Sequence, residues 1–168
     1  MPWADKVPAI LQGWYIGSEA GEALASVLCG DVNPSGKLPF TWYRRLEDCG
    51  AHALGAFPGT WRDDYKVIDE EYREGIYVGY RRRGLSPLFA FGHGLSYTSF
   101  RIGKPQASSR VLTEDGRISF TVSVTNTGSR AGSETVQLYV SDKHASVDRP
   151  VKELKAFQKV FQLIVASF

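Results

Sequence analysis

The spacing of apolar residues divides the sequence into two parts with different periods. Residues 7–11 form a continuous apolar run, which is typical of a strand buried on both faces. The segment after Ser18, a good N-cap, repeats apolar residues at helical spacing as far as Gly30, which can end a helix. This helical face consists of Ala20, Leu24, Val27 and Leu28. A turn-rich stretch then leads to the extended, apolar segment 37–42, so the order of elements predicts one α/β unit of a larger layered domain.

The middle of the sequence loses this periodicity. Residues 43–72 are rich in Gly, Asp, Arg and isolated aromatic residues, which predicts a long surface loop. Residues 74–80 then predict a short strand, with glycines where a backbone or a ligand can approach closely.

From about residue 101 the period is two. Apolar residues alternate with Ser and Thr over residues 118–125, and the alternation returns at 136–140. This pattern predicts an antiparallel β-sandwich, although only about four strands can be identified where an immunoglobulin-like sandwich has about seven. The last residues, 161–168, are uncharged and β-prone, so we expect a truncated sandwich. The fold class predicted from the pattern is therefore α/β followed by all-β.

Composition removes several classes of partner. With 20 basic residues, 18 acidic residues and a net charge of +2, the chain gives no electrostatic reason to expect nucleic acid as a partner. No apolar stretch approaches the roughly 20 residues that cross a bilayer, so no membrane partner is predicted. Cys29 and Cys49 are expected to be unpaired buried thiols, but their pairing stays open.

Four groups of segments resemble signature sequences of the family 3 glycoside hydrolases of the β-glucosidase type. The first is GSEAGEALA at 17–25 with GDVNPSGKLP at 30–39, and the second is YREGIYVGYR at 72–81. The third is PLFAFGHGLSYTSF at 87–100. The fourth comprises VTNTG at 124–128, AGSE at 131–134, VQLYV at 136–140 and RPVKEL at 149–154. The resemblance extends from about residue 1 to residue 161, and it departs from the family at Arg81-Arg82-Arg83-Gly84, where relatives often have an aromatic and acidic stretch.

The resemblance implies the C-terminal part of an enzyme in which a barrel carries an aspartate nucleophile and an α/β sandwich carries a glutamate acid/base. Residues 1–100 would be the C-terminal segment of the α/β sandwich domain, including the loop 43–72, and residues 101–168 a truncated fibronectin type III-like domain. No segment matches either catalytic motif, so no catalytic residue is assigned and the chain alone is expected to be inactive. The parent would hydrolyse terminal β-D-glucosyl or xylosyl residues of an oligosaccharide or glucoside, with retention. This part would pack against the upstream barrel and α/β domain, and a periplasmic or secreted location is implied for the parent.

A retaining glycosidase needs two carboxyl groups about 5 Å apart, and the middle of the chain supplies many carboxylates. These are Asp63, Asp64, Asp69, Glu70, Glu71 and Glu74. A solvated acidic loop explains them better than a catalytic pair does. Glu74 is the best candidate for binding sugar hydroxyls, with a structural ion pair as the favoured alternative. Trp61 is the second substrate-binding candidate, because its ring could stack on a sugar or could equally anchor its own loop.

Other chemistry is not predicted. Gly92-His93-Gly94 indicates a positive-φ turn, and His93 has no second His or Cys at ligand spacing, so neither a metal nor an organic cofactor is expected. The alternative hypothesis treats residues 101–168 as a non-catalytic binding or spacer module, since β-sandwiches have many functions. Its outward positions are Ser, Thr and Gln and not a row of aromatic rings, which disfavours glycan binding.

Overall fold

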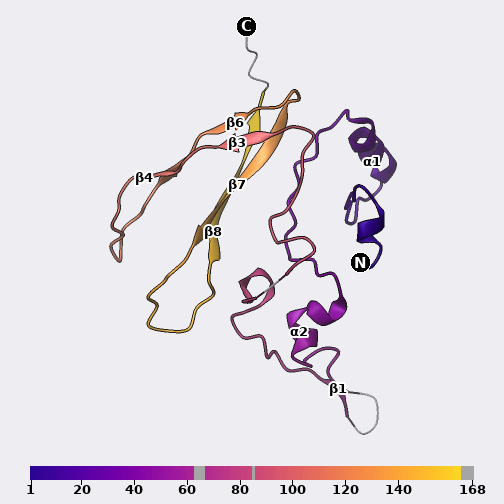
Figure 1. The fold of residues 1–168 in the computed structure, drawn as a ribbon, viewed down its shortest axis with the longest axis vertical. Helices are drawn as coiled ribbons and strands as arrows, with labels where there is room; N and C mark the ends of the chain where they lie inside the picture. Colours follow the sequence, from indigo (N-terminus) through magenta and orange to yellow (C-terminus); the bar gives the residue numbers. More distant parts are fainter. Residues whose placement is uncertain (63–66, 85, 164–168) are drawn as a thin grey trace. The chain divides into compact units, whose positions relative to one another are not determined.

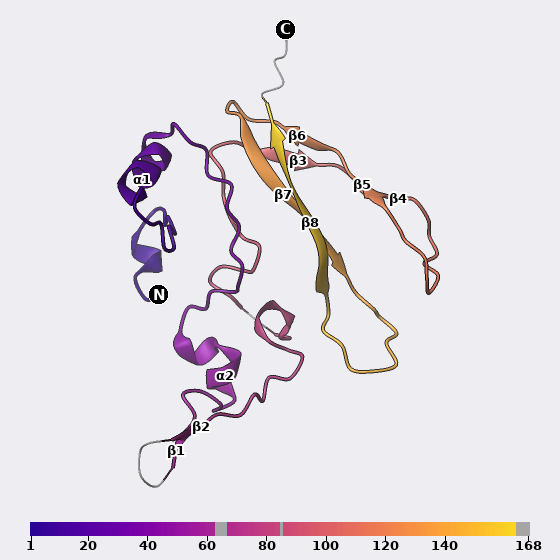
Figure 2. The same cartoon turned by 180° about the vertical axis from the view of Figure 1, so that it is seen from behind.

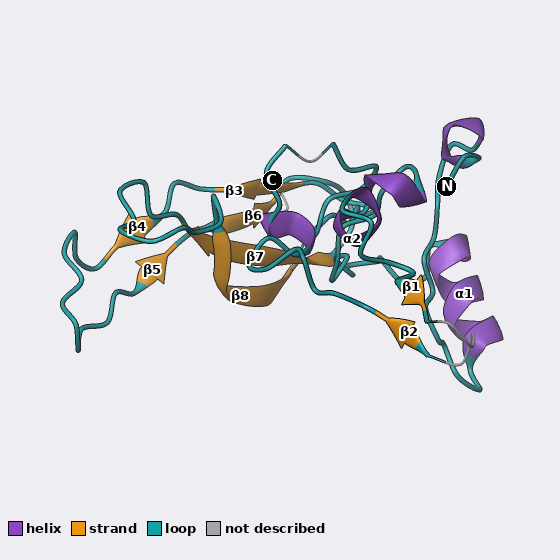
Figure 3. Cartoon of the chain, turned by 90° about the horizontal axis from the view of Figure 1, so that it is seen from below, coloured by secondary structure: helices purple, strands orange, loops and turns teal. Residues whose placement is uncertain are grey.

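The computed structural model describes residues 1–62, 67–84 and 86–163, which form two compact units. The first unit contains the described residues of Met1–Trp14, Lys37–Gly94 and Gln137–Ala156. The second contains those of Tyr15–Gly36, Leu95–Val136 and Phe157–Phe168. Figure 3 shows that loops connect short helices and strands over much of the chain.

Helix α1 (Ala20–Cys29) is the helix predicted from apolar spacing, and it belongs to the second unit. Gly30 ends it as predicted, with φ 84° and its N–H donating to the Val27 carbonyl. The predicted N-cap is wrong, because Glu19 occupies that position and makes no side-chain cap hydrogen bond. The helix therefore begins two residues after Ser18.

The first unit opens with a 3₁₀ helix, η1 (Ala4–Lys6), and not with the predicted strand. Residues 7–11 have no strand conformation, and Val7 and Leu11 are both exposed. An extended segment becomes a strand only when a neighbour pairs with its backbone, and the described residues give 7–11 no such neighbour. Segment 37–42 does find one: Trp42 forms an antiparallel bridge with Phe89.

The predicted loop 43–72 contains short ordered elements. The 3₁₀ helix η2 (Leu46–Asp48) leads into helix α2 (Gly50–Ala53), and strand β1 (Thr60–Trp61) pairs antiparallel with β2 (Ile68–Asp69). The strand predicted at 74–80 is wrong. Gly75 and Gly79 have φ values of 55° and 59°, which an extended strand excludes, and the chain forms a turn followed by the 3₁₀ helix η3 (Gly79–Arg81).

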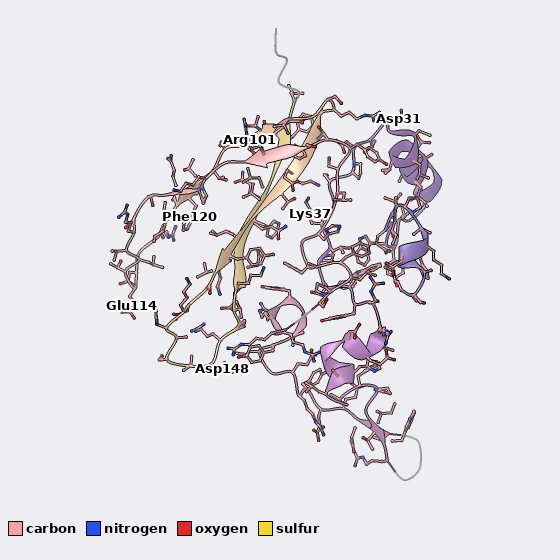
Figure 4. All side chains as sticks on the ribbon, in the orientation of Figure 1. Asp31, Lys37, Arg101, Glu114, Phe120 and Asp148 are labelled. Atoms are coloured by element: carbon pink, nitrogen blue, oxygen red, sulfur yellow. The ribbon has the colours of Figure 1, made fainter. Side chains whose placement is uncertain are left out.

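The β-rich part starts with two short antiparallel ladders in the second unit. Strand β3 (Phe100–Ile102) pairs with β6 (Val124–Asn126), and β4 (Gln106–Ala107) pairs with β5 (Phe120–Thr121). The predicted strand 118–125 is thus divided between β5 and β6. Figure 4 places Phe120 on β5 and Glu114 near the turn that joins β4 to β5.

The two longest strands are β7 (Gly132–Val140) and β8 (Glu153–Gln162), which pair with each other in a two-stranded sheet. They run side by side in Figures 1 and 2. β7 includes the strand predicted at 136–140, which is therefore confirmed. The end of the predicted tail 161–168 lies outside the described residues.

Little of the described chain is buried. Ala56 is the buried apolar residue, and no large side chain is fully buried among the described residues. The accessible surface is 13124 Å², whereas a folded monomer of this mass exposes roughly 8,200 Å². Many large apolar side chains are therefore in contact with solvent, among them Trp3, Leu28 and Phe157.

The cysteines are free, as predicted, but Cys29 is exposed and Cys49 is half-buried, so the prediction of buried thiols is wrong. Within the described residues no helix is long and apolar enough to cross a membrane. No group of three or more His, Cys, Asp or Glu side chains in that part of the chain could hold a metal ion.

Candidate functional site

Glu74 lies in the turn before η3 and is half-buried against helix α2. Its carboxylate lies so close to Gly50 that a Cβ at position 50 would overlap it. The backbone carbonyl of Glu74 accepts a hydrogen bond from the Tyr77 N–H at 3.0 Å, which closes the turn. The absence of a side chain at Gly50 therefore provides the space in which the Glu74 carboxylate lies.

The hydroxyl of Tyr43 reports on the electrostatics around Glu74. Burial raises the pKa of Tyr43, the charges of Cys49 and Glu74 raise it further, and Arg82 opposes them. Arg82 also donates to the Asp48 carbonyl at 3.3 Å, at the end of η2. Glu74 is thus part of a half-buried polar group, and it does not stand alone on an acidic surface.

Trp61 is on β1, directly opposite Ile68 of β2, and is 52% exposed. The two strands meet tightly, since a Cβ on Gly59 would lie 2.6 Å from the Asp69 carbonyl oxygen. Beside Trp61, Arg62 forms an ion pair with Asp69 at 3.0 Å. Trp61 is therefore a half-exposed residue of this hairpin.

The remaining acidic candidates that the structure describes take part in surface ion pairs or are exposed. Glu71 pairs with Arg73 at 2.5 Å, and the hydrogen bond from Arg73 lowers the pKa of the Glu71 carboxyl. A general acid needs a raised pKa, so Glu71 has moved in the other direction. Asp63 and Asp64 lie outside the described residues.

His93 has the turn role that the sequence predicts. Gly92 has φ 80°, and the His93 N–H donates to the Ala90 carbonyl at 3.0 Å. The imidazole stacks on Phe89 with ring centroids 5.3 Å apart. These contacts hold His93 within the turn, and its carbonyl accepts a hydrogen bond from the Leu38 N–H at 2.8 Å.

Two asparagines in the signature segments are hydrogen-bonding centres, a role that the sequence analysis did not assign. Asn33 accepts from the Ser96 hydroxyl and the Tyr97 N–H, both at 2.8 Å, and donates to the Ala131 carbonyl at 2.9 Å. Asn126 is 2% exposed and makes a comparable set of bonds within the second unit. Turn-forming context was the only signal of these roles in the sequence.

Comparison with known proteins gives the family. Residues 1–97 match the family model described as the glycosyl hydrolase family 3 C-terminal domain. The chain belongs to glycosyl hydrolase family 3. Residues 134–164 match the fibronectin type III-like domain model. The fold class predicted from the sequence, α/β followed by a fibronectin type III-like β-sandwich, is thereby confirmed, as is the resemblance to the C-terminal part of this family.

The similar proteins are β-glucosidases. Beta-glucosidase BoGH3A of Bacteroides ovatus is 51% identical over 165 residues, which are 95% of this chain and 21% of that protein. Thermostable beta-glucosidase B of Acetivibrio thermocellus is 46% identical over 164 residues, which are 96% of this chain and 21% of that protein. The chain therefore spans about a fifth of the length of the curated relatives it matches.

Solved structures give the same result. Beta-glucosidase 3B from Thermotoga neapolitana in complex with glucose superposes with a TM-score of 0.81 at 39% identity, over 94% of this chain and 21% of that one. DesR, a β-glucosidase from Streptomyces venezuelae in complex with D-glucose, superposes with a TM-score of 0.84 at 40% identity, over 98% of this chain and 20% of that one. Both matched proteins bind glucose.

Proposed function

We propose that this chain is the C-terminal part of a retaining β-glucosidase that hydrolyses terminal β-D-glucosyl or xylosyl residues. The observation that carries the proposal is its 51% identity to a β-glucosidase over 95% of its own length. The two glucose complexes among the similar structures support a glucoside as the substrate of the parent.

The catalytic carboxylates would come from the part of the enzyme outside this chain. Retaining hydrolysis requires a nucleophilic carboxylate and a protonated acid about 5 Å apart. Among the described acids of the middle segment, Asp69 pairs with Arg62, and Glu71 pairs with Arg73. An ion pair with arginine stabilises the charged form of a carboxyl group. Neither Asp69 nor Glu71 is therefore suited to donate a proton.

Trp61 and Glu74 would contribute to substrate binding at the edge of the assembled site. The half-exposed indole of Trp61 has the apolar face that stacks on a sugar ring. Glu74 can accept hydrogen bonds from sugar hydroxyls while Gly50 provides space for its carboxylate. The division into an α/β segment, 1–100, and a β-sandwich segment, 101–168, belongs to the same proposal.

The chain would pack against the upstream barrel and α/β domain of its parent. Support comes from its exposed apolar side chains, since soluble monomers seldom expose large apolar patches without a partner. Trp3, Val7 and Leu11 in the first unit are 40% to 47% exposed, and Leu28 on helix α1 is 71% exposed. Burying them against the rest of the enzyme would remove this surface from water.

A chimera tests the proposal. In BoGH3A, the region that aligns with this chain is replaced by this chain, and release of nitrophenol from an aryl β-glucoside is measured. We expect an active chimera and no turnover by the chain alone. In the chimera, Trp61→Ala is expected to raise KM roughly three- to tenfold, because it removes one stacking contact with the sugar. Glu74→Gln should also raise KM.

Matched controls separate these effects from general damage. Phe120→Ala and Glu114→Gln change exposed residues of the β4–β5 region and should leave KM unchanged. A folded but inactive chimera would contradict the proposed function. Turnover by the chain alone that Glu74→Gln abolishes would show that the middle segment itself holds the catalytic group. If the chain alone bound a glycan while Trp61→Ala and Glu74→Gln left the KM of the chimera unchanged, the binding-module hypothesis would be favoured.

A further inference from the structure

A hollow of about 310 Å³ in the first unit combines aromatic rings with positive charge. It is lined by Tyr80 and Arg81 of η3, by Arg82 and Phe91, and by Tyr139 of β7 with Lys152. Its volume is at the lower end of the roughly 300–1,000 Å³ of small-molecule sites. The space is sufficient for a compact ligand of the size of one ring and its substituents.

Positive charge predominates in the lining of this hollow. Arg81, Arg82, Arg83 and Lys152 line it, and its described lining includes no carboxylate. Arg83 approaches Asp148 at 3.4 Å, on the loop between β7 and β8 that Figure 4 labels. The other three cations form no ion pair with a described carboxylate. An anion that enters the hollow would therefore meet Arg81, Arg82 and Lys152, none of which is in an ion pair with a described carboxylate, while Asp148 competes for Arg83.

Three aromatic rings in contact with one another form the apolar wall of the hollow. Tyr80 stacks on Phe91 with centroids 4.5 Å apart and meets Tyr139 edge-on at 6.0 Å. The Tyr80 hydroxyl accepts from the Leu154 N–H at 2.9 Å, and the Tyr139 hydroxyl donates to Gln137 Oε1 at 2.7 Å. Partial burial raises the pKa of Tyr139.

Two of the cations already lie over these rings. The Arg81 guanidinium carbon is 5.2 Å from the centroid of Tyr80, and Lys152 Nζ is 5.0 Å from the centroid of Tyr139. Cations and rings therefore alternate around one space, so a ligand can contact both kinds of group together.

A neighbouring hollow shows the contrast. It shares Arg81 with the positive hollow and is also lined by Arg149, Asp148 and Glu153, so its charges are mixed. The positive hollow, in contrast, is lined by the run Arg81-Arg82-Arg83 and by no described carboxylate. The proposed glycosidase function does not account for these arginines.

We propose that this hollow binds a small aromatic carboxylate. The ring of the ligand would lie along the wall of Tyr80, Phe91 and Tyr139, and its carboxylate would accept hydrogen bonds from Arg81, Arg82 or Lys152. A guanidinium group can donate two parallel hydrogen bonds to a planar carboxylate. An aromatic ring in the ligand would also contact the rings of the wall, which an inorganic anion would not. This site is independent of the proposed function.

Benzoate is the probe, and benzamide and inorganic phosphate are its comparisons. Binding to the full chain is measured by NMR titration at low ionic strength. We expect saturable binding of benzoate and at least roughly tenfold weaker binding of the uncharged benzamide. Raising the salt concentration to 0.5 M should weaken the binding of benzoate. Equal binding of benzoate and benzamide would overturn the role of the cations, and equal binding of phosphate would overturn the role of the rings. No saturable binding of benzoate would overturn the proposal as a whole.

Charge-removing variants locate the site. Arg82→Gln should weaken benzoate binding roughly tenfold, and Lys152→Gln, which changes an exposed side chain, should weaken it while leaving the circular dichroism spectrum unchanged. The matched control is Arg101→Gln on β3, outside the first unit, which should leave benzoate affinity unchanged. An equal loss in Arg101→Gln, or no loss in Lys152→Gln, would overturn the assignment of binding to this hollow.

Discussion

Replacement of Asn126 by alanine should destabilise the second unit strongly. The Asn126 amide nitrogen donates to the Arg130 carbonyl at 2.6 Å. Its Oδ1 accepts from the Thr98 hydroxyl at 2.7 Å and from the Gly128 N–H at 3.1 Å. With the residue 2% exposed, water has little access to replace these bonds. At a net 0.5–1.5 kcal/mol for each bond, the loss is about 3 kcal/mol.

Urea unfolding followed by far-UV circular dichroism measures this loss, and amide hydrogen exchange at Gly128 reports it locally. The control is Thr127→Ala, which removes one hydrogen bond of 3.2 Å from an exposed hydroxyl to the Ser99 carbonyl. It should cost no more than about 0.5–1 kcal/mol. If Asn126→Ala loses no more stability than Thr127→Ala, or if exchange at Gly128 is unchanged, the claim that Asn126 holds this turn together is wrong.

Three further predictions use single positions. Gly30→Ala should lower the free energy of unfolding by about 1–2 kcal/mol, because φ is 84° there and a Cβ would lie 2.7 Å from Arg130 Nη1. Its control, Gly21→Ala, lies within α1 in open space and should raise the free energy of unfolding by up to about 1 kcal/mol. Equal urea midpoints for the two variants would contradict this prediction. Asp148→Asn should lower the pKa of Tyr77 toward its ordinary value of 10.0, because the hydrogen bond to Asp148 raises it; tyrosinate absorbance measures this. That bond stabilises the fold below pH 10 and is lost as the pH rises through the raised pKa. Iodoacetamide should label exposed Cys29 faster than half-buried Cys49, as peptide mass spectrometry would show.

Elements whose cause is local could be predicted from the sequence. Helix α1 has its apolar spacing and its terminating Gly30 within one short segment, and the alternation that predicts β7 lies within that strand. The strand predicted at 7–11 is wrong because no described residue pairs with the backbone of this segment. The strand at 74–80 failed because apolar alternation does not reveal a positive φ at Gly75 and Gly79.

The candidate site divides in the same way. The position of Glu74 next to a glycine-rich aromatic segment identified it as a candidate, but its contact with Gly50 joins segments far apart in sequence and could not be predicted. Arg81, Arg82 and Arg83 were conspicuous in the sequence yet had no assigned role. Their aromatic surroundings include Tyr139 of β7, which only the fold brings to η3.

The asparagines of the signature segments show how such motifs can matter without performing chemistry. Asn33 binds the backbone or side chains of residues 96, 97 and 131, and Asn126 binds those of residues 98, 128 and 130. Each amide both donates and accepts, which an aspartate or a leucine of similar size cannot do at once. A substitution at either position would therefore reduce the activity of the BoGH3A chimera through the loss of folded protein. The molecules that still fold would keep an unchanged KM, whereas Trp61→Ala would raise KM without reducing the amount of folded protein. Measuring KM and the amount of folded protein therefore distinguishes a structural motif from a binding residue.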